Sequence, residues 1–186
     1  MSLEEAIFES ETGMDKAVEF MLHEFAAIRT GKASPALVEN LDVDAYGSQM
    51  KLKQLALISA PEPRLLVIQP FDASTVRDIE RAINESKIGI MPAVDGKLIR
   101  IPIPELSEER RRDLAKTVKS LAEDARVRVR ACRREAMEAA KKLQKDGKLT
   151  EDDLRVAETD IQKMTDKYVA SVDKHVETKE AELMKI

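Results

Sequence analysis

The residues best suited to chemistry lie in one stretch, Arg126–Arg134, in which five of nine residues are arginines. The stretch lies inside a helical pattern that starts at Ser107 and runs to about Lys145. Apolar residues recur there every three or four positions and form one stripe: Val118, Leu121, Ala125, Val129, Cys132 and Ala136. At about 100° per residue, another set falls roughly 130° from that stripe: Arg126, Arg130, Arg133 and Arg134. The pattern predicts a helix with one side on a protein core and a row of guanidinium groups facing a partner.

A basic helix face is often only a solvated surface, so the charge pattern decides between the two interpretations. Solvated faces normally mix both signs. Residues 108–134, in contrast, hold ten basic and five acidic side chains, a net charge of +5. The whole chain carries −4, so the remainder sums to −9. Most of these cations are arginines, whose planar fork suits phosphate. We call the row of Arg126, Arg130, Arg133 and Arg134 the arginine ridge. A single basic ridge on an acidic protein predicts that the protein contacts a polyanion at one place.

Catalytic and cofactor-binding patterns are sparse. Neither His23 nor His175 has a cysteine or carboxylate at metal-ligand spacing. Gly31-Lys32 lacks the upstream glycine of a phosphate-binding loop, and no serine occupies a nucleophile elbow. Cys132 falls on the apolar stripe and is expected to be a small core residue in a reducing compartment. We expect no catalytic residue, no metal and no cofactor, and therefore no enzyme.

Composition narrows the class of protein further. Hydrophobic residues make up 43% of the 186-residue chain, which is enough for a core. Charged residues make up 35% and aromatic residues only 3%, a profile typical of long helices with aliphatic seams. So few aromatics argue against an RNA reader that stacks bases. No apolar run approaches the ~20 residues of a membrane span, and the acidic N-terminus argues against a signal or transit peptide.

Two more segments have a helical period. Apolar residues in 3–30 fall on alternating steps of three and four, which is a heptad seam. After a break at Asp146–Lys148, Thr150 and Asp153 have the spacing of a capping box, and an apolar helix face continues to the C-terminus. Three long amphipathic helices predict a three-helix bundle.

Between the first two helices the period changes to that of strands. Strands are expected at residues 41–47, 55–60, 65–68, 88–91 and 98–101. A short helix is expected with Val76, Ile79 and Ile83 on its inner face, capped by Asp72 or Ser74. The fold predicted is mainly α with an α+β insert.

The predicted bundle domain is discontinuous, comprising residues 1–31 and 106–186, and residues 32–105 form the inserted domain. The chain crosses between the domains twice. We expect a hinge at these crossings, formed by Gly31, Lys32, Pro104 and Glu105.

Several ordered motifs also match one family. They are Ile28–Pro35, Gly96–Pro104, Leu106–Arg111, Arg126–Ala136 and Lys179–Met184. With these motifs the chain resembles ribosome recycling factor over its whole length. The resemblance implies an L-shaped molecule, tRNA-like in outline, with a three-helix bundle and a small β/α/β domain on a flexible elbow.

The resemblance also implies a function and its partners. Such a factor acts in the bacterial cytoplasm as a monomer, enters the ribosome after peptide release and binds large-subunit rRNA at an intersubunit bridge. With elongation factor G, which uses the GTP, it splits the post-termination complex into subunits. It needs no cofactor of its own and binds neither DNA nor membrane.

By the same resemblance, Arg130 and Arg133 match the rRNA-contacting arginines of the family. Arg29, Arg111, Arg126 and Arg134 are further candidates, because they occupy basic positions of its motifs or of the predicted ridge. Two positions depart from the expected pattern. Lys32 stands where arginine is expected, and Met91 where asparagine is expected before Pro92. The first keeps the charge but loses the bidentate fork, and the second leaves the local turn open.

A rival interpretation is a helical-bundle adaptor or cochaperone that binds proteins through its seams. It explains the helices and the insert but not the ridge of one sign. A hydrolase hidden in residues 32–105 is a second rival, and the missing catalytic pattern argues against it.

Overall fold

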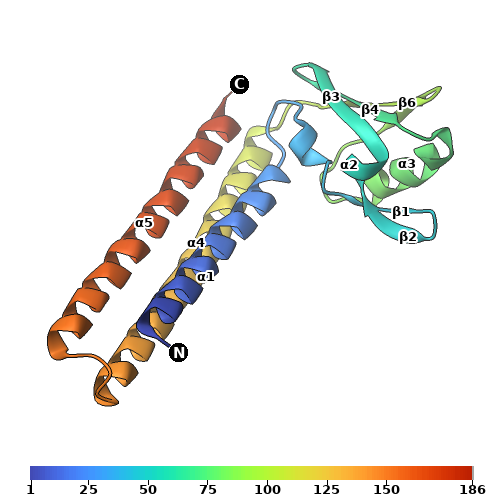
Figure 1. The fold of residues 1–186 in the computed structure, drawn as a ribbon. Coiled ribbons are helices and arrows are strands. Elements are labelled where there is room, and N and C mark those ends of the chain that lie inside the picture. Colours follow the sequence, from blue (N-terminus) through green and yellow to red (C-terminus); the bar gives the residue numbers. More distant parts are fainter. Residues whose placement is uncertain (186) are drawn as a thin grey trace. The chain divides into compact units, whose positions relative to one another are not determined.

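The computed structural model describes residues 1–185 (Figure 1). Its helices are α1 (Leu3–Ala26), α2 (Leu52–Leu55), α3 (Val76–Glu85), α4 (Glu108–Lys145) and α5 (Glu151–Met184). Its strands are β1 (Asp42–Ala45), β2 (Ser48–Lys51), β3 (Ala56–Glu62), β4 (Leu65–Pro70), β5 (Ala93–Asp95) and β6 (Leu98–Pro102). Two 3-10 turns, η1 (Pro35–Leu37) and η2 (Ala73–Thr75), complete the described elements. The predicted fold, a long three-helix bundle with an α+β insert, is confirmed.

The chain separates into two compact units. One contains residues 1–25 and 115–181, and the other contains residues 26–114 and 182–186. These limits fall near the predicted domain boundaries but not on them, since the second unit also takes the first turns of α4.

The bundle unit is built from the apolar seams of α1, α4 and α5. The seam of α1 is buried, as its heptad period predicts, at Met14, Val18, Met21 and Phe25. The facing positions of α4 and α5 are mostly small or β-branched, including Val118, Ala122, Ala125, Val129, Ala136, Ala140, Ala157, Ile161 and Val172, all buried. Such side chains let neighbouring helices approach closely. At one end, Leu3 and Ile7 pack with Ala136, Ala140 and Ile161, which sets α1 antiparallel to α4.

Helices α1 and α4 approach each other closely at Gly13. A Cβ atom at this position would lie 2.7 Å from Cys132 Sγ. Nearby, the Ser10 hydroxyl donates to the Cys132 carbonyl oxygen at 2.9 Å. Cys132 is half-buried rather than fully buried as expected, and this burial raises the pKa of its thiol. The glycine therefore serves close helix packing, although it weakens the helix locally.

This contact predicts a coupled pair of substitutions. Gly13→Ala should destabilise the protein when Cys132 is present, because the added methyl group collides with Sγ. In a Cys132→Ala background the same change should stabilise it by about 1 kcal/mol, the helix propensity difference between alanine and glycine. Urea unfolding of the four proteins of this cycle measures the coupling. An equal effect of Gly13→Ala in both backgrounds would contradict the contact.

Hydrogen-bonded caps fix where the bundle helices begin. The Thr150 hydroxyl accepts from Asp153 N at 3.1 Å, and Asp153 Oδ2 accepts from Thr150 N at 3.1 Å. This is the predicted capping box. Ser107, where the helical pattern was predicted to start, caps α4, since its hydroxyl accepts from Arg110 N at 3.1 Å. A further box joins Ser2 and Glu5 at the start of α1 and was not predicted.

Thr150→Ala should lower the melting temperature by about 2–4 °C, the usual size for a lost cap in a chain of this length. The Thr150 hydrogen bonds hold the pKa of the Asp153 carboxyl below its ordinary value. Stabilisation by a carboxyl with a lowered folded pKa is present above its ordinary pKa, about 3.9, and is lost as pH falls through the folded value. Melting curves should therefore show a smaller gap between Thr150→Ala and the parent protein in acid. A gap that widens in acid would contradict this role.

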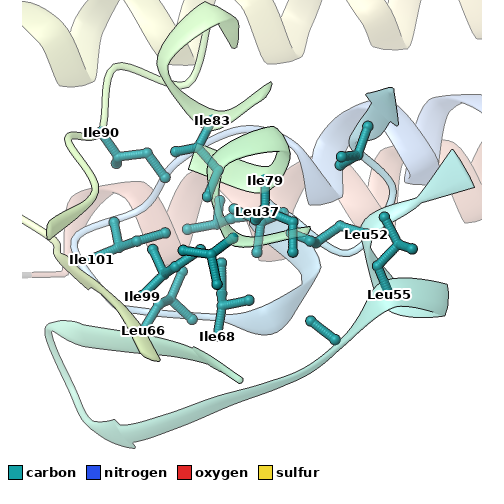
Figure 2. Close-up of a cluster of buried hydrophobic side chains, with 14 of the residues drawn as sticks. Leu37, Leu52, Leu55, Leu66, Ile68, Ile79, Ile83, Ile90, Ile99 and Ile101 are labelled. Carbon is teal, nitrogen blue, oxygen red and sulfur yellow. The ribbon is translucent and has the colours of Figure 1, made fainter. Parts of the chain in front are cut away.

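The inserted unit contains a four-stranded antiparallel sheet in the order β3-β4-β6-β5 and a separate β1-β2 hairpin. The predicted helix is confirmed as α3, and Val76, Ile79 and Ile83 are its buried residues. Asp72 caps the preceding turn η2, because its carboxylate accepts from Ser74 N at 2.9 Å. Figure 2 shows the core, where side chains of α3 meet Leu66, Ile68, Ile99 and Ile101 of the sheet.

Several local predictions for the insert were wrong. Residues 88–91 form no strand, and the strand that precedes β6 and pairs with it is β5 at Ala93–Asp95. Apolar Ile90 enters the core from an irregular segment instead. Leu55 ends α2 rather than starting a strand, and β3 extends through Pro61 to Glu62, where a turn was expected.

Candidate nucleic-acid interface

The arginines of α4 do not form one uniform surface. Arg130 and Arg134 are exposed, Arg133 is half-buried, and the side chain of Arg126 is only 22% exposed. All four lie off the buried stripe, as predicted, but their partners differ. These partners determine how much positive charge each arginine can offer to a ligand.

Arg126 is engaged within the bundle. Its Nε and Nη2 donate to Asp173 Oδ1 of α5 at 3.1 and 2.6 Å, and its Nη1 donates to Glu123 Oε2 at 3.3 Å. The hydrogen bond to Asp173 is the main cause of a raised pKa for Arg126. Two carboxylates therefore neutralise this guanidinium, so it joins α4 to α5 in the free protein. Its predicted RNA contact stays a prediction.

Arg130 has one weak neutralising contact, from its Nη1 to Glu123 Oε1 at 3.3 Å. Its side chain is 51% exposed. Glu123 also contacts Arg126, so one carboxylate partly neutralises two arginines of α4. Arg134 forms no ion pair with any residue of the described chain, 1–185. Arg130 and Arg134 are thus largely available to a partner.

Arg133 contacts a neutral group. Its Nη1 donates to Gln162 Oε1 of α5 at 3.0 Å, and Gln162 Nε2 donates to Asp166 Oδ1 at 2.9 Å. The amide of Gln162 is thereby fixed at both ends. Arg133 Nε is buried and has no acceptor among residues 1–185. This side chain keeps its full charge while its position is held.

Arg128 belongs to a different face of α4. Its guanidinium carbon lies 4.8 Å from the centroid of the Phe20 ring of α1, a cation–π contact. Arg128 was not counted in the ridge, and this contact agrees with that exclusion.

Arg29 lies at the junction that precedes the insert. Its Nη2 donates to the Pro104 carbonyl oxygen, so the two chain crossings are linked. Burial and the nearby charge of Arg110 lower the pKa of Arg29, and its buried Nε lacks an acceptor in the described part of the chain. Close by, Arg64 pairs with Glu105. Arg29 thus has a structural role at the junction, and its predicted RNA contact is untested.

Arg111 is half-buried and lines a cavity of about 400 Å³ at the same junction. Gly31, Lys32 and Glu105 also line it. Three of the four predicted hinge residues therefore surround one cavity, together with one candidate RNA-binding arginine.

The contribution of α5 to this site is not apparent from the sequence. Gln162 and Asp166 carry no local signal of function, and they reach Arg133 only because α4 and α5 are antiparallel. Among residues 1–185, no group of three or more histidine, cysteine or acidic residues is arranged to hold a metal. No helix in this range is long and apolar enough to cross a membrane.

Comparisons with known proteins give a consistent result. The family model described as "Ribosome recycling factor" matches residues 21–184. A ribosome-recycling factor of Akkermansia muciniphila is 60% identical over 188 residues, which cover 100% of both chains. One of Halalkalibacterium halodurans is 53% identical over 182 residues and 98% of each chain.

Solved structures agree with the sequence matches. A solution structure of a ribosome recycling factor has a TM-score of 0.82 and 44% identity, covering 100% of this chain and 99% of its own. A second structure has a TM-score of 0.71 and 43% identity over 100% of both chains. It belongs to a set of models of the T. thermophilus factor and E. coli elongation factor G bound to the E. coli post-termination complex. With matches of this length and identity, the chain belongs to the ribosome recycling factor family.

Proposed function

We propose that this protein recycles bacterial ribosomes after termination. In this proposal it binds large-subunit rRNA near an intersubunit bridge and, together with elongation factor G, splits the post-termination complex into subunits. Support comes from family membership and from a relative that is described in complex with elongation factor G and the post-termination ribosome. The structural observation that carries the RNA contact is the incompletely neutralised set Arg130, Arg133 and Arg134 on one continuous helix, in which Arg130 and Arg134 are exposed and Arg133 is half-buried.

This surface suits a structured RNA. A-form RNA is recognised mainly by shape and by contacts to phosphates and 2′-hydroxyls. Arginines along a straight helix can follow a row of phosphates, and release of counterions drives such binding. Base stacking is not required, which agrees with an aromatic content of 3%. The rRNA-binding set in this proposal is Arg130, Arg133 and Arg134 first, with Arg126, Arg111 and Arg29 as secondary members.

The expected mechanism is mechanical. The bundle supplies a long lever whose helices α4 and α5 contain 38 and 34 residues. Binding energy and the movement of elongation factor G disrupt intersubunit contacts, and elongation factor G hydrolyses the GTP. This chain then contributes no covalent chemistry and needs no cofactor, and it acts in the cytoplasm as a monomer.

We also propose that residues 32–105 move as a body on a hinge at Gly31, Lys32, Pro104 and Glu105. No atom outside its neighbours lies within 4 Å of a Cβ built at Gly31, so this position is unconstrained by packing. The hydrogen bond from Arg29 to the Pro104 carbonyl oxygen joins the two crossings. In this proposal the bundle domain comprises residues 1–31 and 106–186, and the inserted domain comprises residues 32–105.

The test is subunit splitting of post-termination ribosomes, followed by light scattering. Splitting should require this protein, elongation factor G and GTP together, and should be lost in the Arg130→Ala/Arg133→Ala double variant. If the protein binds ribosomes in a salt-sensitive manner but does not split them, the elongation factor G used is mismatched. Elongation factor G from the same species should then restore splitting. Absence of ribosome binding would overturn the proposal and favour a protein-binding adaptor.

A further inference from the structure

A groove of about 770 Å³ runs between α4 and α5 beside the arginine ridge. Arg133 and Arg134 lie on its α4 wall, and Arg155 and Lys163 lie on its α5 wall. Cations from two helices therefore line the groove. Of these two helices, only α4 carries the arginine ridge predicted from the sequence.

We infer that a segment of RNA backbone binds in this groove. The α5 residues Arg155 and Lys163 form its second wall, and Gln162 is the positioning residue for Arg133. The inference rests on the proposed function, because it extends the same RNA contact from α4 to α5. It assigns phosphate recognition to a helix outside the basic ridge.

The charges in the groove are unbalanced. Its lining includes five cations, Arg133, Arg134, Lys141, Arg155 and Lys163, and two carboxylates, Glu138 and Glu158. One carboxylate is already used, since Glu158 lies 3.9 Å from Lys141 Nζ. Within the described chain, 1–185, neither Arg155 nor Lys163 forms an ion pair. The groove thus offers exposed, unneutralised cations to a polyanion.

A comparison of Arg126 with Arg133 shows what Gln162 does. Both arginines reach across to α5, but Arg126 meets a carboxylate at 2.6 Å, whereas Arg133 meets a neutral amide at 3.0 Å. An acidic partner would neutralise Arg133 as Asp173 neutralises Arg126. Gln162 instead holds the guanidinium and leaves its charge for the ligand.

The geometry of the amide strengthens this positioning role. Because Gln162 Nε2 donates to Asp166 Oδ1, its carbonyl oxygen is directed to Arg133. Only Nη1 of Arg133 is used, so its Nη2 hydrogens remain for a phosphate oxygen. A fixed guanidinium also loses less conformational entropy on binding than a free one.

An RNA strand fits these features better than an acidic peptide does. RNA offers a regular row of phosphates, which can engage cations on both walls of a groove. Arginine forks match phosphate in a bidentate manner. The groove adjoins Arg133 and Arg134, so one RNA element can contact the ridge and the groove together.

The test measures binding to purified large ribosomal subunits over a series of KCl concentrations. Arg155→Ala and Lys163→Ala should each weaken binding several-fold. Each should also reduce the slope of log K against log salt by about 0.7–0.9, the value for one lost phosphate contact. Lys174→Ala is the charge-matched control, because Lys174 is an exposed cation of α5 outside the groove. It should leave the slope unchanged.

Two variants test the positioning role of Gln162. Gln162→Met keeps the volume and charge but removes the acceptor, so it should weaken binding without changing the salt slope. Gln162→Glu keeps an acceptor but adds a charge that pairs with Arg133, so it should weaken binding and reduce the slope. A merely structural role would give the same slope in both variants. Circular dichroism melting confirms that each variant is folded.

The outcomes separate this inference from the proposed function. If Arg133→Ala weakens binding while Arg155→Ala, Lys163→Ala and Gln162→Met bind like the parent protein, the groove inference is overturned and the function stands. If Arg133→Ala also has no effect, the proposed RNA site itself fails. Competition identifies the ligand: a duplex RNA should displace the protein from subunits. Displacement by polyglutamate but not by RNA would overturn the RNA assignment.

Discussion

Replacing Ile79 with alanine is expected to make the inserted unit unfold at a temperature where the helical bundle stays folded. Ile79 is fully buried in α3 and packs against the sheet core shown in Figure 2. Removing such a side chain costs about 2–5 kcal/mol, because contacts are lost and a cavity remains. Small domains are stable by only about 5–15 kcal/mol, and a unit of this size lies near the lower end. The substitution should therefore remove a large share of the stability of the insert.

Three signals follow the two units separately. The helix signal in circular dichroism comes mostly from α1, α4 and α5, which contain 24, 38 and 34 residues. Tyr168 is buried in the bundle and donates to Asp15 Oδ1 at 2.7 Å, so its near-ultraviolet signal also reports on the bundle. Amide resonances of β3, β4 and β6 report on the insert. In Ile79→Ala these should lose dispersion at a temperature where both bundle signals persist.

Leu57→Ala is the matched control, because Leu57 lies in the same unit but is 58% exposed. It should change stability by about 0.5 kcal/mol or less. Ile161→Ala is the reciprocal substitution, since Ile161 is fully buried in the bundle. It should lower the helix signal first. If Ile79→Ala instead shifts one common transition for every probe, the two units fold as one and the proposed domain division is wrong.

The bundle could be predicted because its signals are local. Heptad spacing in α1 and the 3.6-residue period of α4 and α5 depend only on residues within each helix. The caps at Ser107 and Thr150 are equally local, as each hydrogen bond joins residues three apart. The insert was harder. Strand β2 is polar and pairs only with β1, so no alternation of apolar and polar residues marks it.

Strand predictions were wrong where apolar residues are buried by tertiary packing and not by a strand. Ile88 and Ile90 lie in an irregular segment next to Gly89, whose φ is +75°, and Ile90 is nevertheless in the core. A short apolar run cannot distinguish these two cases. Met91 in this segment is 75% exposed, so methionine in place of the expected asparagine does not affect packing of the core.

The site was predictable on α4 but not across helices. The period of α4 separates its arginines from the buried stripe, but it cannot tell which of them are neutralised. Arg126 meets Asp173 and Arg133 meets Gln162 through contacts that span 47 and 29 residues in sequence. These partners depend on the register of α4 against α5. Four arginines that are equivalent by type therefore differ in available charge.

From that difference we predict that Arg133→Ala mainly lowers the affinity for ribosomes, whereas Arg126→Ala mainly lowers folding stability. Arg133→Ala should weaken ribosome binding by about 10–100-fold, since a charge-assisted hydrogen bond contributes about 1.5–3 kcal/mol. Its folding stability should change little, because the lost contact is a single hydrogen bond to Gln162. Arg126→Ala removes contacts to Asp173 and Glu123. It should lower stability by about 1 kcal/mol or less, because both carboxylates are exposed to solvent.

Measurement of affinity and stability on the same preparations decides this prediction. Binding of each variant to large subunits at one fixed salt concentration gives the affinity, and urea unfolding gives the stability. Both variants remove one positive charge from the same helix, so a general electrostatic effect would weaken binding equally. Equal losses of affinity would therefore contradict a specific role of Arg133. A larger loss for Arg126→Ala would mean that the ribosome breaks the Arg126–Asp173 ion pair on binding. A selective loss for Arg133→Ala is the expected result, because the neutral partner on α5 leaves the charge of Arg133 available to the ligand, whereas Asp173 neutralises Arg126.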